Sequence, residues 1–196
     1  MDESKTYAVK DISLAGQGLL NIELAEQRMP ALLKVREQLK KAMPFKGLRI
    51  GMALHLTKET AVLVRTLKAL GAEVAIASCN PLSTQDDVAA ALAKENVRVY
   101  GYKGESVEDY YKFIDNVIAV KPDITIDDGC DLVTRIHEKH PELIKGIIGG
   151  CEETTTGVIR LRAMAKAGKL LYPVIAVMTT RPSICLTTTT AQGSRP

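Results

Sequence analysis

The sequence predicts an α/β fold: a doubly wound, mostly parallel sheet of the Rossmann-like kind, with helices on both faces and a helical N-terminal segment. Three observations lead to this prediction. Short apolar runs typical of buried strands recur along the chain. Stretches with helical periodicity, each about 10–15 residues long, separate these runs. Gly, Pro or capping residues stand where one pattern gives way to the other. Strands that alternate with helices favour a parallel sheet with right-handed crossovers.

The first helical pattern begins at Leu19 and runs to Leu39, where apolar side chains interleave with Glu, Arg and Lys. Pro30 interrupts it, so we expect a kink or two helices. Residues 1–17 are polar and carry little periodicity. We therefore divide the chain into an N-terminal helical segment, 1–46, and an α/β domain, 47–177.

Six strands and five helices are expected within the α/β domain. The strands are the apolar runs 47–54, 73–78, 97–100, 123–127, 144–150 and 173–177. One helix is expected from a cap at Thr57 to Gly71, and a second from a cap at Ser83 or Thr84 to Ala93. Three further helices are expected over 107–120, 131–140 and 154–167. Residues 181–196 show no period and include four consecutive threonines, so we expect a non-native or disordered tail after Val177.

Composition excludes several classes of protein. The chain has 196 residues, 46% hydrophobic and 25% charged, which suits one globular domain or two small ones. A net charge of +3 from well-mixed residues gives no nucleic-acid footprint. No apolar run approaches the ~18 residues of a membrane span. The first residues do not resemble a signal peptide, so we expect a cytoplasmic protein.

The cysteines, at positions 79, 130, 151 and 185, show no C-x2-C spacing. In a cytoplasmic chain this pattern favours free, partly buried thiols, with a redox or nucleophilic role as the alternative. The three histidines do not form an H-E-x-x-H motif, and His137 and His140 flank a helix end. We therefore expect no metal site.

Polar and titratable groups gather just after four of the expected strands, where open parallel sheets bind their ligands. The segments are 55–60, 78–86, 127–131 and 149–157. Each has a structural alternative: His55 as a satisfied strand-end histidine, the three aspartates as a solvated turn, and the threonines as helix caps. Because the fold brings these strand ends to one edge, their joint occurrence favours a binding or catalytic site. No G-x-G-x-x-G or P-loop motif is present to hold a pyrophosphate.

These segments closely resemble the S-adenosyl-L-homocysteine hydrolase (adenosylhomocysteinase) family. The matching segments occur in the same order as in the family, and the resemblance extends from about residue 10 to residue 177. The matching segments are 11–18 (DISLAGQG), 54–63 (LHLTKETAVL), 78–92 (SCNPLSTQDDVAAAL), 127–131 (DDGCD) and 152–157 (EETTTG).

The resemblance implies an activity. Family members reversibly hydrolyse S-adenosyl-L-homocysteine to adenosine and L-homocysteine. A tightly held NAD oxidises the ribose 3′-hydroxyl, which acidifies the C4′ proton and lets homocysteine leave from C5′. A water-poor cleft allows a carboxylate and an imidazole to be tuned as acid and base. Intact members are homotetramers, and neither nucleic acid nor membrane is a partner.

The resemblance also implies roles for individual residues. Catalytic roles fall to His55 and Asp128, which would handle protons near C4′ and C5′, and to Glu153, which would hold ribose hydroxyls. The substrate-binding set is Leu54, Thr57, Glu59, Thr60, Asp128 and Glu153, with Thr57 and Glu59 on the adenine. The set expected to reach NAD from the substrate side is Thr154, Thr155 and Thr156. Cys130 and Cys151 stand where many members carry small residues, and we give them no catalytic role.

The chain departs from the family after Val177. A coding sequence for the family's next segment, with one base deleted from its first codon, reads as residues 178–196. We therefore expect 178–196 to be a frameshifted tail. The Lys and Asp that assist 3′-oxidation, the NAD-binding domain and the C-terminal dimerisation segment would then be missing. A polypeptide of this kind is expected to be inactive on its own.

Two alternatives to a hydrolase remain at this point. The chain could be a non-catalytic remnant that binds adenosine weakly, in which case it would be retained on an adenosine resin without turnover. It could also be an α/β domain with no ligand, in which case adenosine would not raise its melting temperature.

Overall fold

The computed structural model describes residues 6–177 and 183–185, which form one eight-stranded sheet flanked by helices. The strands are β1 (Tyr7–Ala8), β2 (Arg49–Leu54), β3 (Glu73–Ser78), β4 (Arg98–Tyr100), β5 (Ile124–Asp127), β6 (Gly149–Glu152), β7 (Val174–Ala176) and β8 (Ser183–Cys185). Their order across the sheet is β1-β4-β3-β2-β5-β6-β7-β8. Neighbouring strands from β1 to β7 pair in parallel, and β8 pairs antiparallel with β7.

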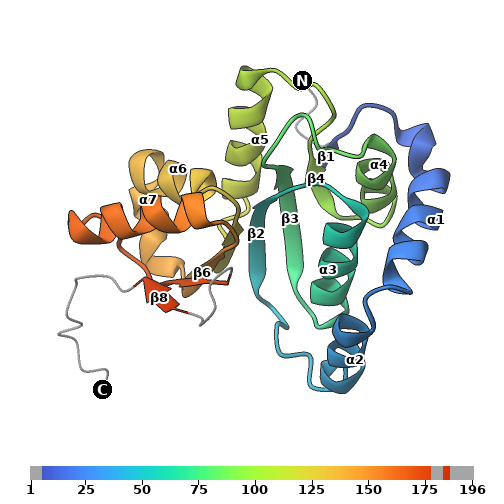
Figure 1. The fold of residues 1–196 in the computed structure, drawn as a ribbon, viewed down its shortest axis with the longest axis horizontal. Helices are drawn as coiled ribbons and strands as arrows, with labels where there is room; N and C mark the ends of the chain where they lie inside the picture. Colours follow the sequence, from blue (N-terminus) through green and yellow to red (C-terminus); the bar gives the residue numbers. More distant parts are fainter. Residues whose placement is uncertain (1–5, 178–182, 186–196) are drawn as a thin grey trace.

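Helices cover both faces of the sheet (Figure 1). They are α1 (Ala15–Glu26), α2 (Pro30–Leu39), α3 (Lys58–Ala69), α4 (Asp86–Lys94), α5 (Val107–Ile118), α6 (Asp131–Lys139) and α7 (Thr155–Lys166), with 3₁₀ turns η1 (Ile12–Leu14) and η2 (Pro141–Gly146). Apolar residues of α1, α3 and α4 pack on one face. Those of α5, α6 and α7 pack on the other. The doubly wound α/β fold predicted from the sequence is confirmed.

The chain reverses direction across the sheet between β2 and β5. From β2 it proceeds through β3 to β4, then returns through α5 to β5 on the other side of β2. This reversal makes the junction of β2 and β5 the topological switch point, where side chains at the carboxyl ends of the strands border a crevice.

Local sequence explains most of the element boundaries. Thr57 caps α3 by accepting a hydrogen bond from the Thr60 N–H, as predicted, and Gly71 ends the helix region with φ +100°. Ser106 and Thr154 cap α5 and α7 in the same way. The bounds of β3 coincide with the predicted strand, and Pro30 separates α1 from α2.

Several predicted boundaries are wrong. The helix expected from Leu19 begins already at Ala15. The helix expected from Ser83 or Thr84 begins at Asp86 instead. Thr84 is buried, with its hydroxyl hydrogen-bonded to Ser78 Oγ at 2.7 Å, and the Gln85 N–H donates to the Leu56 carbonyl at 2.9 Å. These bonds hold residues 84 and 85 in a non-helical conformation beside the residues that follow β2.

The start of the strand predicted over 144–150 is also wrong. Pro141 opens a 3₁₀ turn instead, and the strand begins only at Gly149. Ile144 and Ile147 are buried without joining the sheet, whereas Ile148 is exposed. An apolar run can therefore be buried by side-chain packing alone, without pairing as a strand in the sheet.

The N-terminal segment 1–46 packs as part of the same structure. Within its described residues, Tyr7 pairs with Val99 and adds an edge strand that the sequence did not predict. Ile22 and Ala25 of α1 are fully buried in the core shared with α3 and α4. We propose that this segment is integral to the α/β unit.

The expected tail, 178–196, lies outside the described residues except at Ser183–Cys185, which form β8. None of the helices in the described part of the chain combines the length and hydropathy needed to cross a bilayer.

Candidate active site

Backbone pairing beyond the strand ends brings the predicted site residues together. The Asp128 N–H donates to the Ala53 carbonyl at 3.0 Å, and the Cys79 N–H donates to the Leu54 carbonyl at 3.2 Å. These bonds extend the pairing of β2 with β5 and β3 by one residue. The residues that follow β2, β3 and β5 therefore meet over the switch point.

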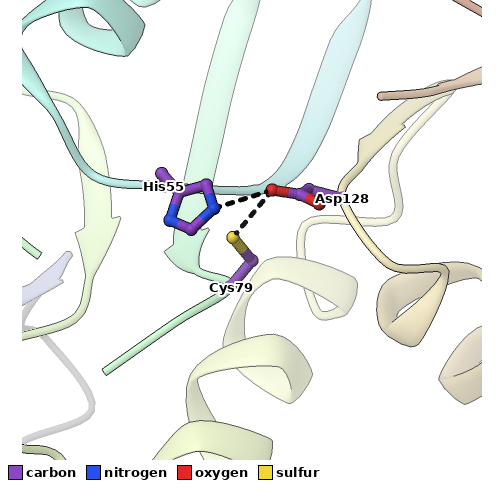
Figure 2. A group of neighbouring side chains, drawn as sticks. All are labelled: His55, Cys79 and Asp128. Atoms are coloured by element: carbon purple, nitrogen blue, oxygen red, sulfur yellow. Dashed lines mark hydrogen bonds and ion pairs between the residues drawn. The ribbon is translucent and has the colours of Figure 1, made fainter. Parts of the chain in front are cut away.

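The side chains of His55 and Cys79 both approach the same carboxylate oxygen of Asp128 (Figure 2). His55 Nε2 lies 3.1 Å from Asp128 Oδ2, and Cys79 Sγ lies 3.3 Å from the same oxygen. The Asp128 side chain is 9% exposed, whereas His55 is 41% exposed. A carboxylate shielded from water thus faces an imidazole that a ligand can reach, an arrangement suited to proton transfer.

The orientation of the His55 ring is fixed from its other side. His55 Nδ1 lies 2.5 Å from Ser83 Oγ, and the Ser83 hydroxyl donates to the Asn80 carbonyl at 3.1 Å. When Nδ1 carries the proton, Ser83 Oγ accepts from Nδ1–H while the Ser83 hydroxyl donates to Asn80. In that tautomer the Nε2 lone pair faces Asp128.

Burial raises the pKa of the Cys79 thiol, and the negative charges of Asp128, Asp127 and Glu153 raise it further. Cys79 is therefore a protonated thiol that donates to Asp128, with little thiolate character. Cys79, Cys130 and Cys151 are free cysteines, as predicted, while the side chain of Cys185 lies outside the description.

Two buried carboxylates, those of Asp127 and Glu152, hold the backbone of the candidate site in place. Asp127 and Glu152 are paired residues of β5 and β6, and both are fully buried. Burial raises the pKa of Asp127 to about 8, and the Glu152 charge adds to this shift. Asp127 accepts hydrogen bonds from the Asp128 and Val133 N–H groups and so fixes the backbone that carries Asp128.

Glu152 holds two loops in place. Its Oε1 accepts from the Gly129 N–H at 2.8 Å and from the Thr154 N–H and hydroxyl, both at 3.0 Å. Its Oε2 is buried and has no hydrogen-bond partner among the described residues. Burial raises the pKa of Glu152. This carboxylate therefore positions the loops after β5 and β6, which carry the candidate site residues.

Glu153 lies exposed beside the His55–Asp128 pair. Its N–H donates to the Asp127 carbonyl at 2.9 Å, which places it at the same sheet edge. Partial desolvation raises the pKa of the Glu153 carboxyl, Asp128 raises it further, and His55 lowers it. The side chain is available as a hydrogen-bond acceptor for a ligand.

The residues expected on the adenine lie at the start of α3. Glu59 is exposed in the first turn, Thr57 is the N-cap, and their neighbour Leu54 is buried at the end of β2. The Thr57 and Thr60 hydroxyls are 3.4 Å apart. Gln85 Oε1 accepts from the Lys58 N–H at 3.0 Å and ties this turn to the segment before α4.

The predicted NAD-facing threonines differ from one another. The Thr154 hydroxyl donates a hydrogen bond to Glu152. It also caps α7, since its Oγ1 accepts from the Gly157 N–H at 3.3 Å. Thr155 and Thr156 are exposed at the start of the helix. Exposed hydroxyls at a helix N-terminus suit an anionic or carbonyl-bearing ligand, so their donor chemistry fits NAD.

From the sequence, Cys79 received no site role and Ser83 was considered only as a helix cap, although both stand in the selected segment 78–86. The signal was available, because Cys79 directly follows β3 just as His55 follows β2. A separate cavity of about 940 Å³ lies elsewhere, lined in part by Tyr7, Arg98 and Phe113, and includes none of the three converging residues.

Known proteins resemble this chain over most of its length. A sequence model of the family described as S-adenosyl-L-homocysteine hydrolase matches residues 6–142 and 133–181. An S-inosyl-L-homocysteine hydrolase of Methanocaldococcus jannaschii is 57% identical over 171 residues, 87% of this chain and 41% of that protein. An adenosylhomocysteinase of Sulfurisphaera tokodaii shows the same identity and coverage.

An adenosylhomocysteinase of Thermococcus kodakarensis is 54% identical over 177 residues, which is 90% of this chain and 42% of the relative. The chain thus spans about two fifths of the length of the curated relatives it matches. The family match covers nearly all of the described residues, including every strand end that forms the candidate site. The chain belongs to the S-adenosyl-L-homocysteine hydrolase family.

Proposed function

We propose that this chain forms the substrate-binding part of an enzyme that reversibly hydrolyses S-adenosyl-L-homocysteine to adenosine and L-homocysteine with the help of NAD. The observation that carries the proposal is the His55–Asp128 pair, 3.1 Å apart across the switch point of a doubly wound sheet. Membership of the family supports it. The names of the relatives supply the substrate class.

Each candidate residue has a defined task in this proposal. Asp128 and His55 handle protons near C4′ and C5′ of the ribose, because their side chains lie 3.1 Å apart at the switch point. Glu153 accepts hydrogen bonds from the ribose hydroxyls, because its carboxylate is exposed beside that pair. Cys79 donates to Asp128 and orients it without touching the reacting atoms.

NAD, when bound, would supply hydride-transfer chemistry at the ribose 3′ carbon. Thr155 and Thr156 are the residues of this chain that would contact it, while Thr154 holds their loop against Glu152. A polypeptide of these 196 residues contains no G-x-G-x-x-G segment. We therefore expect it to bind adenosine without catalysing turnover when NAD is added.

Glu59 favours an adenine over a hypoxanthine base. The relatives' names include both S-adenosyl and S-inosyl substrates. Adenine carries an amino donor at position 6, whereas hypoxanthine carries a carbonyl acceptor there. The exposed Glu59 carboxylate at the start of α3 can accept from an amino group but repels a carbonyl. Adenosine is thus expected to bind more tightly than inosine, and Glu59→Gln to narrow the difference.

Calorimetric titration of the chain with adenosine tests the proposal. Saturable binding at one site is expected, and Glu153→Gln should weaken it roughly 10-fold or more, the value of a hydrogen bond to a charged group. Glu73→Gln is the matched control, because Glu73 is an exposed glutamate at the opposite end of the sheet. No binding, or equal losses from both substitutions, would contradict the proposal.

A further inference from the structure

The His55 ring and the Cys79 thiol both face one oxygen of Asp128 (Figure 2). The donor atoms, Nε2, Sγ and a carboxylate oxygen, all lie within 4.8 Å of one another. A tetrahedral zinc ion with ordinary bond lengths holds such donors roughly 3.3–3.6 Å apart. The observed separations from Asp128 Oδ2 are 3.1 Å to Nε2 and 3.3 Å to Sγ. Small side-chain movements would therefore complete three corners of a zinc site.

The support around His55 is the kind that metal-binding histidines have. A ligating imidazole donates its other N–H to a fixed acceptor, which sets the tautomer and the ring orientation. In the tautomer of His55 that carries its proton on Nδ1, Nδ1–H donates to Ser83 Oγ, and the Ser83 hydroxyl donates to the Asn80 carbonyl. The Nε2 lone pair is consequently available at the centre of the cluster.

The charge of the surroundings also favours a cation. The carboxylates of Asp128 and Glu153 both act on Cys79 as negative neighbours. His55 is 41% exposed, so an ion can enter from solvent and keep a fourth, open position. A thiol and an imidazole beside one carboxylate suit Zn²⁺ far better than Mg²⁺ or Ca²⁺, which prefer oxygen ligands.

We propose that His55, Cys79 and Asp128 form an inhibitory Zn²⁺ site within the proposed active site. Binding joins the ion to Nε2, Sγ and an Asp128 oxygen, and the thiol proton passes to solvent. Because the ion occupies the two groups proposed to move protons, Zn²⁺ and adenosine exclude one another. This last consequence rests on the proposed function, whereas the metal site itself does not.

Zinc and cobalt titrations of the chain test the site without any nucleoside. After removal of metal with a chelator, the chain should take up one equivalent of Zn²⁺ in competition with a chromophoric chelator. Co²⁺ in its place should give a thiolate-to-cobalt charge-transfer absorption, and Mg²⁺ should not compete. Cys79→Ser should abolish that absorption and weaken Zn²⁺ binding by more than the ~10–100-fold typical of losing a supporting residue.

Cys151→Ser is the matched control, since Cys151 is a second half-buried free thiol with no part in the cluster. It should leave Zn²⁺ binding unchanged. Ser83→Ala should weaken binding by ~10–100-fold while keeping the cobalt absorption, because it removes only the support of the ring. Circular dichroism of each variant establishes that it is folded.

Zn²⁺ binding that is equally tight in Cys79→Ser and the unsubstituted chain would overturn the site. Cobalt binding without thiolate absorption would do so as well. Adenosine titration in the presence of a chelator reports on the proposed function separately. If Zn²⁺ binds as described but adenosine does not bind in that titration, the metal site stands and the proposed function fails.

Discussion

The backbone of Gly157 packs directly against the carboxylate of Glu152. A Cβ atom at position 157 would lie 2.1 Å from Glu152 Oε1 and 2.2 Å from its carboxyl carbon, far inside any tolerated contact. The same Oε1 accepts three hydrogen bonds from Gly129 and Thr154. Glycine at the first turn of α7 is thus required for the carboxylate to hold the loops of the site.

Gly157→Ala should destabilise the chain by about 2 kcal/mol or more, because the methyl group displaces a buried carboxylate whose Oε1 accepts three hydrogen bonds. Gly16→Ala is the matched control: it also lies near the start of a helix and has no atom within 4 Å of the added Cβ. That control should be neutral or stabilising by up to ~1 kcal/mol. Urea denaturation measures both, and equal stability of the two variants would refute the packing argument.

The N-terminal helix should contribute to the stability of the whole α/β unit. Ile22 in α1 is fully buried against α3 and α4, so Ile22→Ala should cost about 2–5 kcal/mol in a single unfolding transition. Leu20 in the same helix is 56% exposed, so Leu20→Ala should lower the free energy of unfolding by less than about 0.5 kcal/mol. A separate low-temperature transition in Ile22→Ala would instead indicate that residues 1–46 unfold independently.

Stability should fall as the pH rises through the acidic and neutral range because of Glu105. Burial raises its pKa to about 7 from 4.5, and the charges of Asp109 and Asp86 add to the shift. Between these two pKa values, the Glu105 carboxyl ionises in the unfolded chain but keeps its proton in the folded one. Ionisation therefore stabilises the unfolded state, and the free energy of unfolding falls. At ~1.4 kcal/mol per pKa unit, a loss of a few kcal/mol is expected across this window.

Glu105→Gln should flatten that part of the stability curve. The amide oxygen can still accept from the Tyr102 N–H, which now donates to Glu105 Oε2 at 3.1 Å, and no charge develops at the buried Oε1. Thermal unfolding between about pH 4 and pH 8 compares the two proteins. An unchanged pH slope in the variant would show that Glu105 does not titrate as described.

The sequence predicted the fold class and the strand-end residues because both depend on local patterns. Apolar runs located β3, and the rule for ligands in parallel sheets selected the segments 55–60 and 127–131. The roles of His55 and Asp128 within these segments were implied by the resemblance to the family. The pairing of Cys79 with Asp128 could not be predicted in this way. It requires the order of β3, β2 and β5 across the sheet, which no local pattern encodes.

Other departures have equally physical reasons. Thr84 has the chemistry of a helix cap, but its hydroxyl is bonded to Ser78, a residue on the preceding strand. Ile144 and Ile147 are apolar enough for a strand but pack in and beside a 3₁₀ turn that follows Pro141. Both errors arise where a long-range contact outweighs a local preference.

The imidazole NMR signals of the three histidines test the central claim most directly, namely that adenosine binds at the switch point of the sheet. Each signal can be assigned by a single His→Gln substitution at His55, His137 or His140. Adenosine added to the chelator-treated chain should shift the His55 signals alone, because the other two lie around the end of α6. Unchanged His55 signals at saturating adenosine, or shifts confined to His137 and His140, would contradict the account.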